Sequence, residues 1–243
     1  MKFSPPALNC QLCPRLAAFR ADNKAKFPDK FNAPVPAFGD LDAQVLVVGL
    51  APGLKGANFS GRPFTGDYAG DLLYETLLKF GFARGTYGRA KNDGLELVNC
   101  RVTNAVRCVP PENKPTTDEM NTCRDFLKEE IAAMPNLRTI VSLGLISHNA
   151  VLKTFGHKIS AFKFAHGACH QLQKIAPSPL RGREGVGVSN IQHPPPNPLP
   201  QGRGDSLEVV GEITLIDSYH CSRYNTQTNR LTIEMFEDVF EKI

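Results

Sequence analysis

The segments QVLVVGL, at residues 44–50, and APGLKGANFSGRPFTGD, at residues 51–67, decide the fold of this chain. The first is a continuous apolar run that ends in a loop rich in glycine and proline. This pattern is typical of a parallel strand that is buried on both faces. Residues 138–143 (RTIVSL) repeat the pattern and are closed by Gly144. Both runs are therefore predicted to be inner strands of one parallel sheet.

Helix patterns alternate with these strand patterns. Residues 69–80 place their leucines on one helical face, and Thr116 with Glu119 forms the capping box of a helix from 117 to about 133. Further helices are predicted at 145–155 and 231–243, and further strands at 95–99, 102–106, 162–165 and 213–217. The alternation favours an α/β sandwich with a mainly parallel sheet.

Ligands of such sheets bind beyond the carboxyl ends of the strands. The loops after Leu50, Asn99 and Asp217 are therefore the expected place for a site. The loop at 51–67 is rich in glycine but has neither a P-loop nor a dinucleotide fingerprint. Phe64 in this loop is either a platform for a planar ligand or a core residue, and its chemistry alone leaves both open.

Composition limits the class of protein. The 243 residues carry 28 Lys and Arg against 24 Asp and Glu, and 42% are hydrophobic. The net charge of +4 excludes a strongly basic nucleic-acid coat protein, and the hydrophobic content excludes a disordered chain. We expect a single domain over residues 1–243, monomeric and cytoplasmic. It has no apolar run long enough to serve as a signal peptide or a membrane span.

Residues 177–205 differ from the rest of the chain. They hold 7 of the 19 Pro and 5 of the 20 Gly and show no apolar period. They are predicted to be a disordered surface insertion between two strands, resembling translated extragenic repeats of bacterial genomes. His193, which lies within them, is not expected to be catalytic.

Four of the 7 cysteines are candidate metal ligands. Cys10 and Cys13 form a C-x-x-C pair, and Cys108 and Cys123 are separated by 14 residues. In a reducing compartment such cysteines serve zinc or an iron–sulfur cluster better than disulfides, and a set of four thiolates suits either group. The remaining cysteines, Cys100, Cys169 and Cys221, are expected to be structural.

Three motifs in order resemble one known family. GLAPGLKGANFSGRPFTGD, VTNAVRCVPPENKPT and SYHCSRYNTQTNRLT look like the motifs of the family 5 uracil-DNA glycosylases, an iron–sulfur group of that superfamily, and the likeness spans nearly the whole chain apart from the insertion. The resemblance implies an α/β/α sandwich with a central four-stranded, mainly parallel sheet. It also implies a monofunctional repair enzyme that flips uracil, and other deaminated bases, out of DNA and excises it.

The resemblance implies roles residue by residue. Asn104 pairs with the uracil edge, His220 stabilises the departing anion at O2, and Asp67 orients water or balances the sugar cation, with Asp71 as the competing carboxylate. The implied substrate-binding residues are Gly49, Leu50, Ala51, Pro52, Gly53, Phe64, which stacks on the base, and His166. The implied DNA contacts are Arg62, Ser222, Arg223, Asn225 and Thr226, with residues 223–228 entering the helix gap. The implied ligands of a 4Fe–4S cluster are Cys10, Cys13, Cys108 and Cys123.

Basic residues near the motif loops are expected to bind phosphates. Besides Arg62 and Arg223 they are Lys55, Arg107, Lys114 and Arg230.

The chain departs from the family at Cys221, where the family has Pro. Two alternative functions stay open. One is an iron–sulfur DNA-binding module without catalysis, supported by Cys221 and the insertion, and the other is a family 4 enzyme restricted to uracil. Leu50 argues against the second, because family 4 carries Glu there.

Overall fold

A computed structural model describes residues 3–175 and 209–243. Its central sheet has the strand order β4-β1-β5-β7-β6. Four strands, β4 (Cys100–Asn104), β1 (Val45–Gly49), β5 (Thr139–Leu143) and β7 (Val209–Ser218), each pair in parallel with their neighbours. They correspond to the strands predicted at 102–106, 44–50, 138–143 and 213–217, whereas the strand predicted at 95–99 is reduced to β3 (Glu96–Leu97) in a separate two-stranded sheet. A fifth strand, β6 (Cys169–Ile175), pairs antiparallel with β7 at the edge, so the sheet has one strand more than expected.

The strand predicted at residues 162–165 is wrong. A 3-10 turn, η2 (Ile159–Ala161), precedes this segment, which continues as a loop. Its apolar rings contact imidazoles instead of strand partners: Phe162 lies against His157 and His170, and Phe164 against His148. The edge strand forms further on, where polar residues alternate around a fully buried Leu172.

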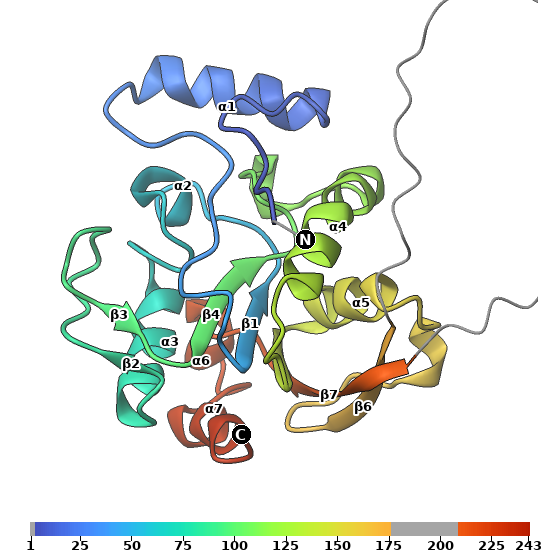
Figure 1. Cartoon of the computed structure of the whole chain (residues 1–243). Coiled ribbons are helices and arrows are strands. Elements are labelled where there is room, and N and C mark those ends of the chain that lie inside the picture. The colour runs from blue at the N-terminus through green and yellow to red at the C-terminus, as the bar shows by residue number, and fades with distance from the viewer. Residues whose placement is uncertain (1–2, 176–208) are drawn as a thin grey trace, which may run out of the picture.

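Alternating residues of β1 separate two cores. Val45 and Val47 face α3 (Tyr68–Lys79) and α7 (Ile233–Phe240), whereas Leu46 and Val48 face α4 (Thr117–Ala132) and α5 (Leu145–Thr154). The two pairs of helices lie on opposite sides of the sheet (Figure 1), which confirms the three-layer sandwich. The capping box of α4 forms as predicted, with Thr116 and Glu119 bonding each other's backbone.

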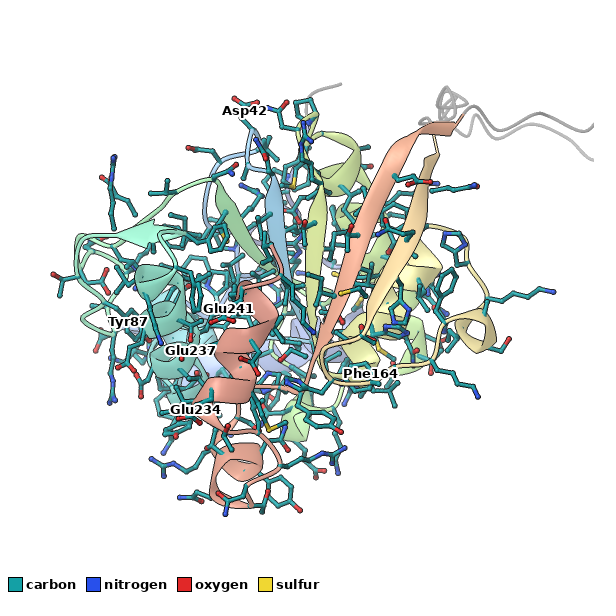
Figure 2. The ribbon with its side chains drawn as sticks, turned by 90° about the horizontal axis from the view of Figure 1, so that it is seen from below. Asp42, Tyr87, Phe164, Glu234, Glu237 and Glu241 are labelled. Carbon is teal, nitrogen blue, oxygen red and sulfur yellow. The ribbon has the colours of Figure 1, made fainter. Side chains whose placement is uncertain are left out.

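Helix α7 covers the α3 side of the sheet and has a separate polar face. Glu234, Glu237 and Glu241 project from this helix (Figure 2). The exposed Lys79 of α3 pairs with Glu237 at 2.6 Å, and such a surface ion pair contributes little beyond the apolar packing beneath it. The apolar face of α7 is docked on α3 and β7.

The N-terminal segment contains a helix that no periodic sequence pattern predicts. Helix α1 (Pro14–Lys26) begins at a proline, which the first helical turn tolerates because no backbone donor is needed there. The remaining elements are α2 (Ala57–Ser60), β2 (Ala83–Arg84), β3 (Glu96–Leu97), η1 (Pro111–Asn113) and α6 (Arg223–Gln227).

The predicted insertion at 177–205 lies outside the described residues. The two strands that flank this part of the sequence, β6 and β7, are paired up to Ile175 and Val209. Among the described helices, none combines the length and the apolar character that crossing a bilayer requires.

Candidate active site

A cavity of about 410 Å³ opens where the parallel strands end. This volume falls in the range of small-ligand pockets. The cavity lies at the carboxyl ends of the strands. The last residues of β1 and β4, Gly49 and Asn104, pair with each other at this edge. Its lining brings together ten of the predicted site residues with four others: Leu50, Ala51, Pro52, Gly53, Phe64, Asp67, Asn104, His220, Ser222 and Arg223, and in addition Ala57, Tyr68, Ala69 and Asn113.

Gly49 allows the cavity to form although it does not line it. A Cβ atom at this position would overlap both the Oδ1 atom of Asn104 and the ring of Phe64. The Asn104 amide and the Phe64 ring therefore lie close together above the backbone of Gly49, which has no side chain. Phe64 has a positive φ of 50°, which is costly for a residue other than glycine, and it is 7% exposed. Phe64 thus belongs both to the core and to the cavity wall.

His220 follows the end of β7 and faces the ring of Phe64. The centroids of the two rings are 6.0 Å apart and their planes differ by 31°. Burial lowers the pKa of His220 to about 4, so at neutral pH the imidazole is uncharged and can donate one N–H. Within the described chain, the side chains of His220 and Asn104 bond to no other residue and remain available to a ligand.

Asp67 is the carboxylate of the cavity. It caps α3 by accepting a hydrogen bond from the backbone N–H of Gly70, and the glycines at 53 and 56 leave room for its Oδ2 atom. Burial raises the pKa of Asp67. Asp71, the competing carboxylate, is absent from the cavity lining and pairs with Arg89 at 2.6 Å. The geometry therefore favours Asp67 as the group that acts on a ligand.

Arg62 does not lie where a phosphate contact requires. It is 3% exposed, and its guanidinium makes two hydrogen bonds of 2.7 Å to Asp93. The rings of Phe38, Tyr74 and Tyr87 surround it at 5.1 to 5.7 Å. Arg62 faces the interior in this conformation, which corrects the expected DNA contact. Arg62 was expected to bind phosphate because it stands in a motif loop. Nothing near it in the sequence indicates that it pairs with Asp93.

Arg107 and His166 also lie away from the expected contacts. Arg107 is 2% exposed and its guanidinium pairs with the buried carboxylate of Glu130 at 2.5 Å, so it cannot bind DNA phosphates here. His166 is absent from the cavity lining. Its Nδ1 atom accepts a hydrogen bond from the backbone N–H of Tyr219, its Nε2 atom bonds the Met235 carbonyl, and its ring stacks on Tyr219. It therefore holds the backbone next to His220.

The segment predicted to enter DNA begins at the cavity rim. Residues 223–227 form the one-turn helix α6, which Ser222 caps by accepting a hydrogen bond from the Asn225 backbone. Arg223 lies over the ring of Tyr68 at 5.6 Å, and Tyr224 is 71% exposed. Asn225 and Thr226 bond within this turn and to His220, and do not line the cavity. Lys55, Lys114 and Arg230 are exposed, as a phosphate contact requires.

Four residues of the lining were not predicted from the sequence. Ala57 and Ala69 contribute small apolar surfaces, and Tyr68 and Asn113 contribute polar groups. Tyr68 is adjacent to Asp67, and Asn113 stands inside the motif VTNAVRCVPPENKPT. Both could have been found from their position in the motifs, although neither residue type alone signals a ligand contact.

Four predicted cysteine ligands gather in a second, narrow cavity. Cys10, Cys13, Cys108 and Cys123 line it together with Arg20. Each of the four is a free thiol, and Leu16 and Phe126 pack around them. The Nε atom of Arg20 is buried without a hydrogen-bond partner among the described atoms. The four sulfurs are therefore the candidate ligands, and the Arg20 guanidinium, which bonds the Leu8 and Cys10 carbonyls but has a free Nε, lies beside them.

Comparisons with known proteins agree with this arrangement. The family described as the uracil DNA glycosylase superfamily matches residues 36–243. The chain is 39% identical, over 95% of its length and 90% of the relative's, to a type-5 uracil-DNA glycosylase of Thermus thermophilus. It is 32% identical, over 97% and 88%, to a type-5 enzyme of Pyrobaculum aerophilum. A type-4 enzyme of the latter organism is 34% identical over 67% of this chain and 69% of its own.

Proposed function

The chain belongs to the uracil DNA glycosylase superfamily, and from this premise we propose that it excises uracil from DNA in base-excision repair. The reaction hydrolyses the N-glycosidic bond and leaves an abasic site. The observation that carries the proposal is the meeting of Phe64, Asn104, Asp67 and His220 around one cavity at the strand ends. The relatives that match over nearly the full chain are named for the same activity.

The cavity supports a leaving-group mechanism. As the bond breaks, the sugar becomes cationic and uracil leaves as an anion, so donors aimed at the developing charge lower the barrier. His220 is neutral and donates an N–H to the uracil O2, and the Asn104 amide pairs with the edge of the base. The ring of Phe64 stacks on the base, a contact worth roughly 1–3 kcal/mol.

Asp67 supports the sugar side of the reaction. Its carboxylate is the acidic group of the lining and balances the positive charge on the sugar or orients the attacking water. Leu50, at the position where a strong base would stand, is apolar. The mechanism therefore relies on stabilising the leaving group and needs no covalent nucleophile.

The rim of the cavity is suited to extruding a base from a duplex. Flipping a base costs a few kcal/mol, which contacts to the phosphates and to the vacated gap must offset. Arg223 and Ser222 line the rim, and Asn225 and Thr226 belong to the same helical turn. We assign phosphate binding to Arg223, Lys55, Lys114 and Arg230, which are exposed.

The four cysteines suit a 4Fe–4S cluster better than a zinc ion. No three of their sulfurs in the described chain lie within 4.8 Å of one another. Around one zinc ion, with Zn–S bonds of about 2.3 Å, the sulfurs would be about 3.8 Å apart. The unpartnered Nε of Arg20 also suits an anionic group at this place. A bound cluster supplies a structural cross-link between the N-terminal segment, the loop after β4, and α4.

Release of uracil from a uracil-containing duplex tests the proposed function. We expect purified wild-type protein to create abasic sites, and His220→Ala and Asn104→Ala each to lower kcat about 100-fold or more. His157→Gln, outside the cavity, is the matched control and retains activity. Wild-type protein that binds this duplex but releases no base would establish the non-catalytic binding module instead. A panel of duplexes with other deaminated bases measures the breadth of specificity.

A further inference from the structure

Two histidines and an aspartate meet on the far side of β7 from α7, outside the lining of the active-site cavity. His148 stands on α5, His170 on β6 and Asp217 on β7. The Nδ1 atom of His148 lies 2.7 Å from Asp217 Oδ1, and the Nε2 atom of His170 lies 3.0 Å from Asp217 Oδ2. One nitrogen of each ring and one carboxylate oxygen lie within 4.8 Å of one another, and within the described chain this is the only such set of three.

The contacts of His148 require a proton or a cation between its Nδ1 atom and the Asp217 carboxylate. Its Nε2 atom lies 3.1 Å from the backbone oxygen of Phe162, which can only accept, so the ring carries a proton on Nε2. In the neutral ring, Nδ1 then presents a lone pair to the carboxylate oxygen of Asp217 at 2.7 Å. Two acceptors at that distance need a positive charge between them, either a second proton or a metal ion.

The surroundings are those of a metal site. His148 and Asp217 are fully buried, and a buried carboxylate is costly unless hydrogen bonds or a cation compensate its charge. The backbone N–H of Ala165 donates to Asp217 Oδ2 at 3.4 Å. Ser142 Oγ donates to Asp217 Oδ1 at 2.8 Å and fixes the carboxylate. Histidine ligands characteristically donate their second ring N–H to a backbone carbonyl, as His148 does to Phe162. Phe164, beside β6 and β7 (Figure 2), shields the imidazole of His148 edge-on.

We propose that His148 Nδ1, His170 Nε2 and the two carboxylate oxygens of Asp217 bind a zinc ion. Two imidazoles and a bidentate carboxylate provide the four-coordinate N and O donor set that zinc accepts. His170 is 13% exposed and gives the ion a path from solvent. The ion joins α5, β6 and β7 and braces the strand end that leads, three residues on, to His220. It has a structural role and does not depend on the glycosylase activity proposed above.

Metal analysis of the full-length protein tests this site. Zinc bound per chain is measured in the wild type, in His170→Gln and in His157→Gln, each equilibrated with zinc and dialysed. We expect about one zinc per chain in the wild type and in the His157→Gln control, and a loss of that zinc in His170→Gln. The visible absorbance of the cysteine-bound cluster is compared in the same samples, and it stays unchanged because the two sites share no ligand.

Cobalt(II) distinguishes these donors from the cysteines. At the proposed site it gives ligand-field bands without intense thiolate-to-cobalt absorption, and the bands disappear in His170→Gln. Equal zinc in the wild type and His170→Gln overturns the proposal. If His170→Gln does not fold, the imidazole ¹⁵N spectrum of zinc-equilibrated wild type decides. A metal-bound, unprotonated Nδ1 of His148 supports the site, and a protonated Nδ1 shows a buried imidazolium and overturns it.

Discussion

The side chain of Asn225 donates a hydrogen bond from Nδ2 to the backbone oxygen of His220 at 2.8 Å. This bond ties the helical turn that approaches DNA to the residue that stabilises the leaving group. On the other side, His166 accepts the backbone N–H of Tyr219 at 3.1 Å. The backbone around His220 is thus held from both ends, although neither holding residue touches the cavity.

Replacing Asn225 by Ala should lower kcat by about five- to tenfold, because one hydrogen bond contributes about 1 kcal/mol to holding His220 in place. The change should fall on kcat, since the ground-state contacts to the base remain. Single-turnover kinetics on a uracil duplex measures it. Thr226→Ala is the matched control, because its hydroxyl bonds only within the same turn. Equal losses in both variants would show a general loosening of the turn.

The acid limb of the pH–rate profile should report Asp67. Burial raises the pKa of this carboxyl above its usual 3.8, so as the pH falls Asp67 loses its charge before an ordinary aspartate does. His220 stays neutral down to a pH of about 4. Activity should therefore fall on the acid side of Asp67's pKa.

In Asp67→Asn, which keeps an oxygen to cap α3, activity should be lower throughout, and the remaining acid limb should report His220, which titrates at a pH of about 4. Measuring kcat/KM against pH for both proteins checks this. An unshifted acid limb in the variant would remove Asp67 from the reaction.

The parallel core of the fold and most of the cavity lining were predictable from local sequence patterns. Continuous apolar runs gave β1 and β5, and the capping box gave the start of α4 at the correct residue. Because parallel strands end at one edge, residues at the ends of β1, β4 and β7 converge there. Phe64, Asn104 and His220 lie together for this reason. The site loop expected after Asn99 is wrong, because β4 begins at Cys100 and its carboxyl end is Asn104.

The two wrong predictions of arginine–DNA contacts share one cause, which is a partner distant in the sequence. Arg62 pairs with Asp93, 31 residues away, and Arg107 pairs with Glu130 on α4. Local sequence cannot distinguish a basic residue with such a partner from one facing solvent. β6 was missed for a different reason: among its described side chains at 169–173, only Leu172 is buried, and polar residues flank it on an edge strand.

Arg62 should matter for stability and not for DNA affinity. Desolvation opposes ionisation of Asp93, but the hydrogen bonds from Arg62 outweigh it and hold the pKa of Asp93 well below its usual range. Breaking such a buried pair costs about 3–5 kcal/mol. We expect Arg62→Ala to lower the free energy of unfolding in urea by that amount.

Folded Arg62→Ala protein should bind DNA with an unchanged salt dependence, whereas Arg223→Ala should reduce the slope of log affinity against log salt by about one. If Arg62→Ala does not fold, Asp93→Asn provides the milder test. Because the pKa of Asp93 is lowered on folding, the stabilisation is present above pH 3.8 and is lost as the pH falls further. A reduced salt slope in either variant would restore Arg62 or its loop as a DNA contact.

The cysteine site should hold iron. Purified protein should be brown, with about four iron atoms and sulfides per chain, and its visible absorbance should bleach on reduction. Cys108→Ser should lose iron and stability together, whereas Cys169→Ser, an exposed cysteine outside the site, should keep both. A colourless protein with zinc on these four cysteines would replace the iron assignment and leave the fold unchanged.

Deletion of residues 177–205 should leave activity nearly intact. β6 and β7 pair as an antiparallel hairpin up to Ile175 and Val209, and the deletion leaves Ala176 and residues 206–208 as a four-residue connection between them. Loops of this length are common in hairpins. The shorter loop also costs less entropy to close. We therefore expect an unchanged kcat/KM on the uracil duplex and an unfolding free energy equal to or slightly above that of the full chain. A control with the same 29 residues replaced by a Gly-Ser linker separates loop length from loop sequence. If the deletion loses activity and the linker variant retains it, the length of the connection matters. If both lose it, the sequence of the insertion is required.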